Sequence, residues 1–324
     1  MKRHIAVRIT TLLAISLVVG AMSVVTAKAS GRVNPSVRES VSSITQATRA
    51  TVERLQLPSS QSPAGQGQAG DQLPDSPIYV SLGDSVAAGA GLTPLPAATK
   101  VDETCDRSSE SYPYQVAIAL QSTVTQLACS GAKVDEGIYG RQARQGVRIP
   151  AQLDIAFAAQ KPDIITATIG ANDARWTQFI RQCYVTRCGT RFDEARAKVY
   201  RADLRIELTR MLGQIQIEGA GKPAQVYIGG YYDPLVNLDC ITSNRITAEE
   251  LVWLKAQTAS LNQAIQSVTP LFSFVTYVPI DFTGHELCSD EPWVQGMEAA
   301  APIHPTATGQ SAIAQAFVRS MQTQ

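Results

Sequence analysis

The sequence predicts an α/β fold: a three-layer α/β/α arrangement around a five-stranded parallel sheet. From residue 77 onward, short apolar runs alternate with longer segments that have apolar residues at helical spacing. The short runs are apolar throughout, which is typical of strands that helices cover on both faces. A segment as long as 77–324 can bury about three quarters of its unfolded surface. We therefore expect it to form one domain.

Each element follows from this pattern. The expected strands are the five apolar runs, at residues 78–82, 124–128, 163–169, 225–229 and 272–278. The expected helices are the five longer segments, at residues 112–121, 149–160, 192–218, 248–268 and 308–321. In an open parallel sheet, ligands bind beyond the carboxyl ends of the strands. The loops after the first three strands are therefore where we expect functional residues.

The first 76 residues differ from the rest of the chain. Basic residues precede an apolar stretch over 9–26, and Ala27-Lys28-Ala29 carries small residues at the spacing that signal peptidase reads. We expect a signal peptide over 1–29 and a secreted, extracellular protein. The alternative is an uncleaved anchor that holds the protein at the cell surface. Residues 30–76 contain a Ser-, Gln-, Gly- and Pro-rich stretch and predict a flexible linker with a short helix.

Composition excludes several classes of protein. The chain has 28 Lys+Arg and 28 Asp+Glu, and removal of residues 1–29 would leave a formal charge of −4. Nucleic-acid binding needs a surplus of positive charge, so we expect no nucleic-acid partner. Three histidines and the lack of a Cys-x-x-Cys pair give no pattern for a metal site. We expect neither a metal nor an organic cofactor.

All six cysteines follow the expected signal peptide: Cys105, Cys129, Cys183, Cys188, Cys240 and Cys288. An even number in an oxidising compartment predicts disulfides. Six cysteines allow fifteen pairings, and spacing does not choose among them, although pairing in sequential order is the simplest.

Four residues in the expected loops have chemistry suited to acyl transfer. Ser85 follows the first strand, where a helix N-terminus favours a developing oxyanion, although a Ser there is equally typical of an N-cap. Gly131 allows close approach to a backbone N–H, and Asn172 offers an amide donor; each is also typical of an ordinary turn. His304 precedes the last helix and suits the role of base for a serine. His285 is the other histidine that follows the signal peptide.

Together these loops resemble the SGNH hydrolases, also called the GDSL esterase and lipase family. Gly83-Asp84-Ser85, Ser130-Gly131, Gly170-Ala171-Asn172-Asp173 and His304-Pro305 match the four motifs of that family in order. The resemblance covers essentially all of 77–324 and implies a flavodoxin-like SGNH hydrolase fold. Cys105-Asp106-Arg107-Ser108 and Gly284-His285-Glu286-Leu287-Cys288 resemble an exported actinobacterial-type branch with three sequential disulfides. That branch implies the pairs Cys105–Cys129, Cys183–Cys188 and Cys240–Cys288.

The resemblance implies a monomeric serine esterase or lipase that hydrolyses small-molecule or lipid esters. Ser85 would be the nucleophile and His304 the base. The oxyanion hole would consist of the backbone N–H groups of Ser85 and Gly131 and the side chain of Asn172. The alternatives are a carbohydrate esterase that removes acetyl groups from glycans and an exported binding module without catalysis.

One position departs from the family pattern. The family usually carries Asp three residues before the histidine, where this sequence has Ala301. We therefore expect a Ser85–His304 dyad in which the backbone carbonyl of Ala301 orients the imidazole, as the resemblance implies for some members. The alternative is a carboxylate from elsewhere in the chain, since geometry rather than sequence position defines a triad. The candidates are Asp290, Glu291 and Glu298.

Overall fold

The computed structural model describes residues 76–235 and 246–323. The expected signal peptide lies outside the described residues, as do the expected linker (except for residue 76) and Cys240. Within the described ranges, no helix has the length and apolar character needed to cross a membrane.

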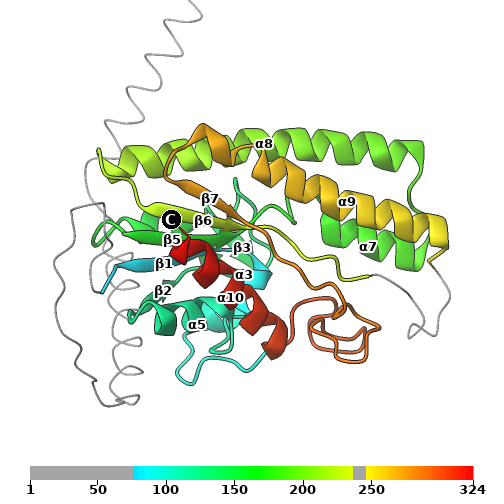
Figure 1. The fold of residues 1–324 in the computed structure, drawn as a ribbon, viewed down its shortest axis with the longest axis horizontal. Coiled ribbons are helices and arrows are strands. Elements are labelled where there is room, and N and C mark those ends of the chain that lie inside the picture. The colour runs from blue at the N-terminus through cyan, green and yellow to red at the C-terminus, as the bar shows by residue number, and fades with distance from the viewer. Residues whose placement is uncertain (1–75, 236–245, 324) are drawn as a thin grey trace, which may run out of the picture. The chain divides into compact units, whose positions relative to one another are not determined.

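A five-stranded parallel sheet forms the centre of the described chain and confirms the expected fold class (Figure 1). Its strand order is β2-β1-β5-β6-β7. The strands are β1 (Tyr79–Gly83), β2 (Val124–Gln126), β5 (Ile164–Thr168), β6 (Gln225–Gly229) and β7 (Val275–Val278). β1 and β5 are buried at every position, because helices cover both faces of the sheet.

Helices form the two outer layers (Figure 1). On one side α5 (Tyr112–Ala119) packs against α10 (Ala307–Gln322), and the rings of Tyr112 and Phe317 stack at 4.8 Å. On the other side α8 (Arg191–Gly219) packs against α9 (Ala248–Gln266). The shorter helices are α3 (Ser85–Ala88), α4 (Lys100–Thr104), α6 (Gln152–Ala156), α7 (Trp176–Val185) and the 3-10 helix η1 (Thr269–Leu271).

One expected helix has different bounds, and one helix was missed. The helix expected over 149–160 begins only at Gln152, because Ile149 ends a small antiparallel hairpin of β3 (Gln142–Arg144) and β4 (Val147–Ile149). Gln145 and Gly146 form its tight turn, with φ of +48° and +77°, as two-residue hairpins favour. Helix α7 was not expected, although its buried residues recur at helical spacing: Trp176, Phe179, Ile180 and Cys183.

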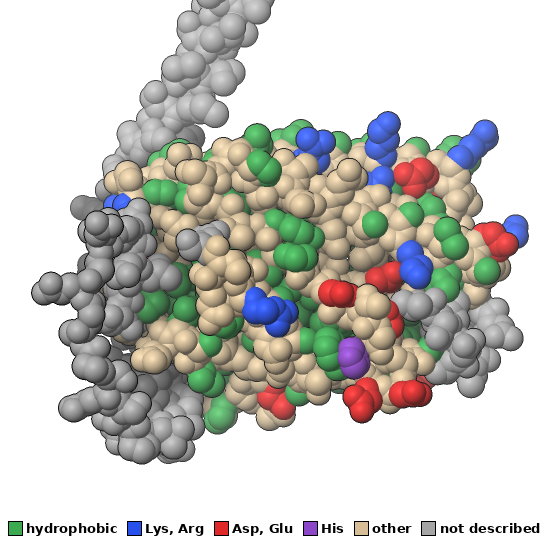
Figure 2. Space-filling model, viewed as in Figure 1, with side chains coloured by type: hydrophobic (Ala, Val, Ile, Leu, Met, Phe, Trp, Pro, Cys, Tyr) green, Lys and Arg blue, Asp and Glu red, His purple; other side chains and the backbone are tan. Residues whose placement is uncertain are grey.

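Two of the expected disulfides are present, Cys105–Cys129 and Cys183–Cys188. The third expected pair includes Cys240, which lies outside the described residues, so that pair stays a prediction. Figure 2 shows basic and acidic side chains both distributed over one face of the molecule, with blue side chains along the edge that α8 forms. This face carries no continuous area of one charge.

The order of the strands determines where a ligand can bind. The chain passes from β1 to β2 on one side and then returns to β5 on the other side of β1. Such a reversal opens a crevice at the carboxyl ends of the two strands that flank it. Ser85 follows β1 and Asn172 follows β5, so both lie at this switch point.

Candidate active site

A sharp turn at the end of β1 presents Ser85. Gly83 has a φ of +136°, and a Cβ there would lie 2.4 Å from the Thr168 carbonyl oxygen, so the turn requires glycine. The backbone N–H of Asp84 donates to that same carbonyl at 2.9 Å. The Asp84 carboxylate caps α3 by accepting from the backbone N–H of Val86 at 3.0 Å. Ser85 is therefore the first residue of α3 and is half-buried.

The imidazole of His304 lies directly against this serine. Its Nε2 is 2.7 Å from Ser85 Oγ, and its Nδ1 is 3.0 Å from the carbonyl oxygen of Pro302. A carbonyl only accepts hydrogen bonds, so Nδ1 carries the proton and Nε2 is left to accept from the serine hydroxyl. Burial lowers the pKa of His304, while the backbone carbonyls of Pro302 and Ala301 oppose this shift. The ring is therefore a neutral base at neutral pH.

The acceptor at Nδ1 is a correction to the expected site. We expected the Ala301 carbonyl, but that oxygen closes a turn by accepting the backbone N–H of His304 at 3.2 Å. The carbonyl of Pro302 faces the ring instead. The alternative acids, Asp290, Glu291 and Glu298, are exposed. In the described part of the chain no carboxylate forms an ion pair with His304.

The three amide groups expected to form the oxyanion hole lie in the loops that follow β1, β2 and β5. Among the described residues, the backbone N–H groups of Ser85 and Gly131 have no hydrogen-bond acceptor. Gly131 is exposed and has a φ of +80°. Asn172 donates one of its two amide N–H groups to the Ala132 carbonyl at 2.9 Å, which leaves the other available.

Several contacts fix the Gly131 loop. The disulfide Cys105–Cys129 joins it to the end of α4. The buried Arg107 guanidinium donates to the carbonyls of Leu127 and Ala128, both at 2.9 Å. The Asp173 carboxylate accepts from the backbone N–H of Val134 at 3.0 Å. Burial raises the pKa of Asp173 to about 6. The loops after β2 and β5 are thus tied together.

The loop that carries His304 depends on Gln295. Its buried amide donates to the carbonyls of Ala90 at 2.8 Å and Pro305 at 2.9 Å, and its backbone N–H donates to the carbonyl of His304 at 2.7 Å. The other histidine, His285, stacks on Trp293 with ring centroids 3.7 Å apart. Its Nδ1 hydrogen-bonds the Glu291 carbonyl at 2.9 Å. His285 therefore stabilises the loop.

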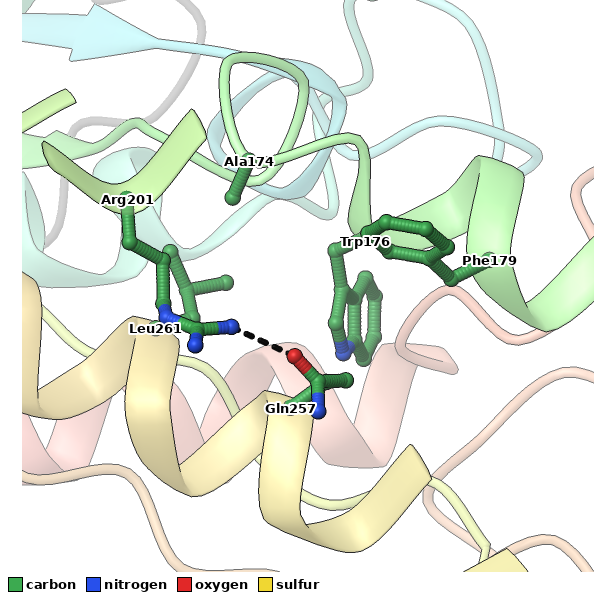
Figure 3. A pocket seen from close by; sticks show the side chains of 6 residues that line it. All are labelled: Ala174, Trp176, Phe179, Arg201, Gln257 and Leu261. Carbon is green, nitrogen blue, oxygen red and sulfur yellow. Dashed lines mark hydrogen bonds between the residues drawn. The ribbon is translucent and has the colours of Figure 1, made fainter. Parts of the chain in front are cut away.

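A small cavity lies between α7, α8 and α9 (Figure 3). It is lined by Ala174, Trp176, Phe179, Arg201, Gln257 and Leu261, and Arg201 donates to Gln257 across it at 2.5 Å. Its volume of about 10 Å³ is the space of roughly one water molecule. It is too small to hold an ester.

An α/β fold with a hydroxyl, an imidazole and free amide donors at one edge of its sheet has the arrangement of a serine hydrolase. Residues 81–312 match the GDSL-like Lipase/Acylhydrolase family, and the chain belongs to that family. It is an enzyme, a carboxylic ester hydrolase of the lipase and esterase type. The expected resemblance is thereby confirmed.

Related proteins agree with this assignment. A lipase of Streptomyces rimosus is 29% identical over 243 residues, which cover 72% of this chain and 82% of that protein. The crystal structure of the extracellular lipase of Streptomyces rimosus aligns with a TM-score of 0.54 at 24% identity, over 76% of this chain and 99% of that one. The same values hold for phospholipase A1 of Streptomyces albidoflavus. At this identity the two structures support the fold.

Proposed function

We propose that the protein is a secreted serine esterase or lipase that hydrolyses carboxylic esters through an acyl-serine intermediate. The observation that carries the proposal is the 2.7 Å contact between Ser85 Oγ and His304 Nε2, with the opposite ring nitrogen against a carbonyl. This geometry leaves Nε2 able to accept the proton of the serine hydroxyl.

In the acylation step, Ser85 Oγ attacks the carbonyl carbon of the ester while His304 Nε2 takes its proton. The tetrahedral intermediate then collapses, and the alcohol leaves with the proton from His304. In the deacylation step, His304 removes a proton from water, whose oxygen attacks the acyl carbon and releases the acid. His304 then returns the proton to Ser85, so the enzyme is restored.

The negative charge that forms on the ester oxygen needs hydrogen-bond donors. The backbone N–H groups of Ser85 and Gly131 and the free amide N–H of Asn172 are the donors we assign to it. Their availability among the described residues supports this role. Loss of one such donor typically costs about 10²–10³ in turnover.

A carbonyl takes the place that a carboxylate has in a full triad. It accepts the Nδ1 proton and so fixes the tautomer and the orientation of the ring. It carries no full negative charge, so it stabilises the imidazolium that forms during catalysis less than an aspartate does. We therefore assign catalysis to a Ser85–His304 dyad oriented by Pro302.

Lipid esters are the proposed substrates, and the extracellular space is the proposed location. The matching Streptomyces rimosus protein is named a lipase, and the solved structure from that organism is an extracellular lipase. The signal-peptide pattern at residues 1–29 supports export. We propose that the enzyme acts as a monomer.

Two experiments test this function. Peptide mass spectrometry after reaction with a fluorophosphonate is expected to find one adduct, on Ser85; a folded protein without that adduct would instead be a binding module. A series of p-nitrophenyl esters from acetate to palmitate then tests the substrate class. We expect kcat/KM to rise with chain length, whereas activity limited to acetate would favour a carbohydrate esterase.

A further inference from the structure

Two consecutive tyrosines, Tyr231 and Tyr232, lie in the loop that follows β6 and have no role in the chemistry described above. Both are almost completely buried, with 1% and 2% of their surface exposed. A buried tyrosine hydroxyl needs a hydrogen-bond partner. The Tyr231 hydroxyl bonds a residue next to Ser85, and the Tyr232 hydroxyl bonds a residue next to His304.

The hydroxyl of Tyr231 connects two of the functional loops. It donates to Asp84 Oδ2 at 2.5 Å and accepts from the backbone N–H of Ala171 at 3.2 Å. Asp84 immediately precedes Ser85, and Ala171 immediately precedes Asn172. One hydroxyl thus ties the nucleophile turn to the loop that supplies the amide donor.

The hydroxyl of Tyr232 contacts the loop that carries His304. It donates to the carbonyl of Ile303 at 2.7 Å, and Ile303 immediately precedes His304. Ile303 has a φ of +61°, a conformation that is unusual for a β-branched residue and persists only where the surroundings hold it. The second restraint on Ile303 is its backbone N–H, which donates to the Gln295 carbonyl at 2.9 Å.

The two tyrosines are themselves fixed in place. Asn262 of α9 accepts from the backbone N–H of Tyr231 and donates to its carbonyl, both at 2.7 Å. The ring of Tyr232 stacks on Phe282 with centroids 4.3 Å apart. Trp176 packs against both tyrosine rings. These contacts restrict the positions of the two hydroxyls.

We propose that Tyr231 and Tyr232 are positioning residues that together set the distance between Ser85 Oγ and His304 Nε2. This inference rests on the proposed function. Tyr231 acts through Asp84, and Tyr232 acts through the backbone of Ile303. The two tyrosines are adjacent in a segment whose position is fixed. The same rigid segment therefore holds both Ser85 and His304, and so fixes their positions relative to each other.

The test compares Tyr231→Phe and Tyr232→Phe with Tyr79→Phe. Tyr79 is a matched control because it is also buried, at 1% exposure, and its hydroxyl bonds Thr166 at 2.7 Å within the sheet. Ester hydrolysis gives kcat and KM, and the rate of fluorophosphonate labelling reports on the attack by Ser85, which His304 activates, without the deacylation step. The fraction of protein that is labelled at the end of the reaction gives the concentration of active enzyme. Unfolded molecules are therefore excluded from the enzyme concentration used to calculate kcat.

We expect each of the two variants to lower kcat and the labelling rate about tenfold or more, with KM within about twofold of the wild type. Tyr79→Phe is expected to lower the melting temperature to a similar extent and to leave kcat unchanged. The NMR resonance of the proton on His304 Nδ1 is expected to shift in Tyr232→Phe and to stay in place in Tyr79→Phe. If a phenylalanine variant does not fold, Asn262→Ala, which releases the Tyr231 backbone, is expected to lower kcat with KM unchanged.

Equal kcat in all three phenylalanine variants would overturn the positioning role. So would a loss of kcat in Tyr79→Phe as large as that in the other two. These results concern the tyrosines as long as the wild type hydrolyses esters and is labelled at Ser85. A wild type that does neither would refute the proposed function itself.

Discussion

The two halves of the proposed dyad are built in different ways. Ser85 lies where regular structure meets, at the end of β1 and the start of α3. Its turn is held by backbone contacts to β5 and by a glycine that no other residue can replace. Between β7 and α10, in contrast, the chain forms neither helix nor strand over residues 279–306. His304 is placed there by the side chains of Gln295 and Tyr232.

This difference determines how strongly substitutions around each residue affect activity. Backbone hydrogen bonds of a sheet survive the loss of any one side chain, so the position of Ser85 depends less on the side chains around it, of which the Tyr231 hydroxyl is one. The position of His304 depends on a few side-chain hydrogen bonds as well as on backbone bonds with Gln295, and a single substitution removes each of the side-chain bonds. We therefore expect the histidine loop to be the more sensitive half of the site.

Removal of the nucleophile is expected to have the largest effect on activity. Ser85→Ala is expected to lower kcat by about 10⁴-fold or more, because the residual rate comes from binding and the oxyanion donors alone. Steady-state ester hydrolysis measures this loss, and thermal unfolding is expected to be almost unchanged. Retention of more than a tenth of the wild-type kcat would show that another residue is the nucleophile.

Removal of an oxyanion donor has the next largest effect. Asn172→Ala is expected to lower kcat by about 10²–10³ with a small change in KM, because the donor acts mainly in the transition state. It also removes the hydrogen bond to the Ala132 carbonyl, so thermal unfolding is measured in parallel. A loss of stability without a loss of kcat would exclude Asn172 from the oxyanion hole.

Two buried glutamines, one beside Ser85 and one beside His304, test whether the histidine loop is the more sensitive part of the site. Gln152 bonds both the N–H and the carbonyl of Gly83, at 2.8 Å and 2.9 Å, on the nucleophile side. Gln295 has the equivalent role on the histidine side. Both alanine variants are expected to lose stability, but Gln295→Ala is expected to lower kcat about tenfold further. Equal kcat in the two variants would remove the asymmetry.

The pH dependence of activity and of stability has different origins in the two halves. Burial lowers the pKa of His304 from its ordinary 6.5, so kcat/KM is expected to fall only on the acid side of that value.

Burial raises the pKa of Asp84 to about 7, so the folded protein binds the extra proton between about pH 4 and 7. The contribution of Asp84 to stability is therefore lost as the pH rises through this range.

Asp84→Asn removes this titration. The melting temperature of the variant is expected to increase relative to the wild type as the pH rises from about 4 to 7. Thermal unfolding of both proteins across this range measures the difference. A constant difference would mean that Asp84 titrates at the same pH in the folded and unfolded chains.

The smallest effect on activity is expected from the disulfide farther from the catalytic loops. Cys183–Cys188 has a sequence separation of 5 and Cys105–Cys129 one of 24. In the chain-entropy account their removal costs up to about 2 and about 3.5 kcal/mol, respectively. Denaturant unfolding of the two double-alanine variants measures these losses. The Cys183/Cys188 variant is expected to retain its kcat, and a large loss would connect α7 to the active site.

The sequence was sufficient for the parts of the structure that residue types alone encode. Buried parallel strands are apolar throughout, so all five were found, and the 225–229 run matched β6 at both ends. The sequence left only two candidates for the catalytic base, because only His285 and His304 follow the expected signal peptide. The close contact of Ser85 and His304 agrees with the order of the four motifs.

Other features depend on backbone geometry that residue types do not reveal. Any residue has a carbonyl, so the sequence could not show that Pro302 rather than Ala301 faces the imidazole. The positive φ of Ile303 is not predictable for a β-branched residue. Tyr231 and Tyr232 resembled ordinary core residues, since their partners are distant in sequence.

The proposed dyad is tested most directly by the rate at which a fluorophosphonate labels Ser85 in the wild type and in His304→Ala, followed by peptide mass spectrometry between pH 5 and 8. A single adduct on Ser85 is expected in the wild type, with a rate that falls toward the acid end. The rate in His304→Ala is expected to be at least about 10³-fold lower and independent of pH. Labelling at a different residue, or equal rates in the two proteins, would contradict the account.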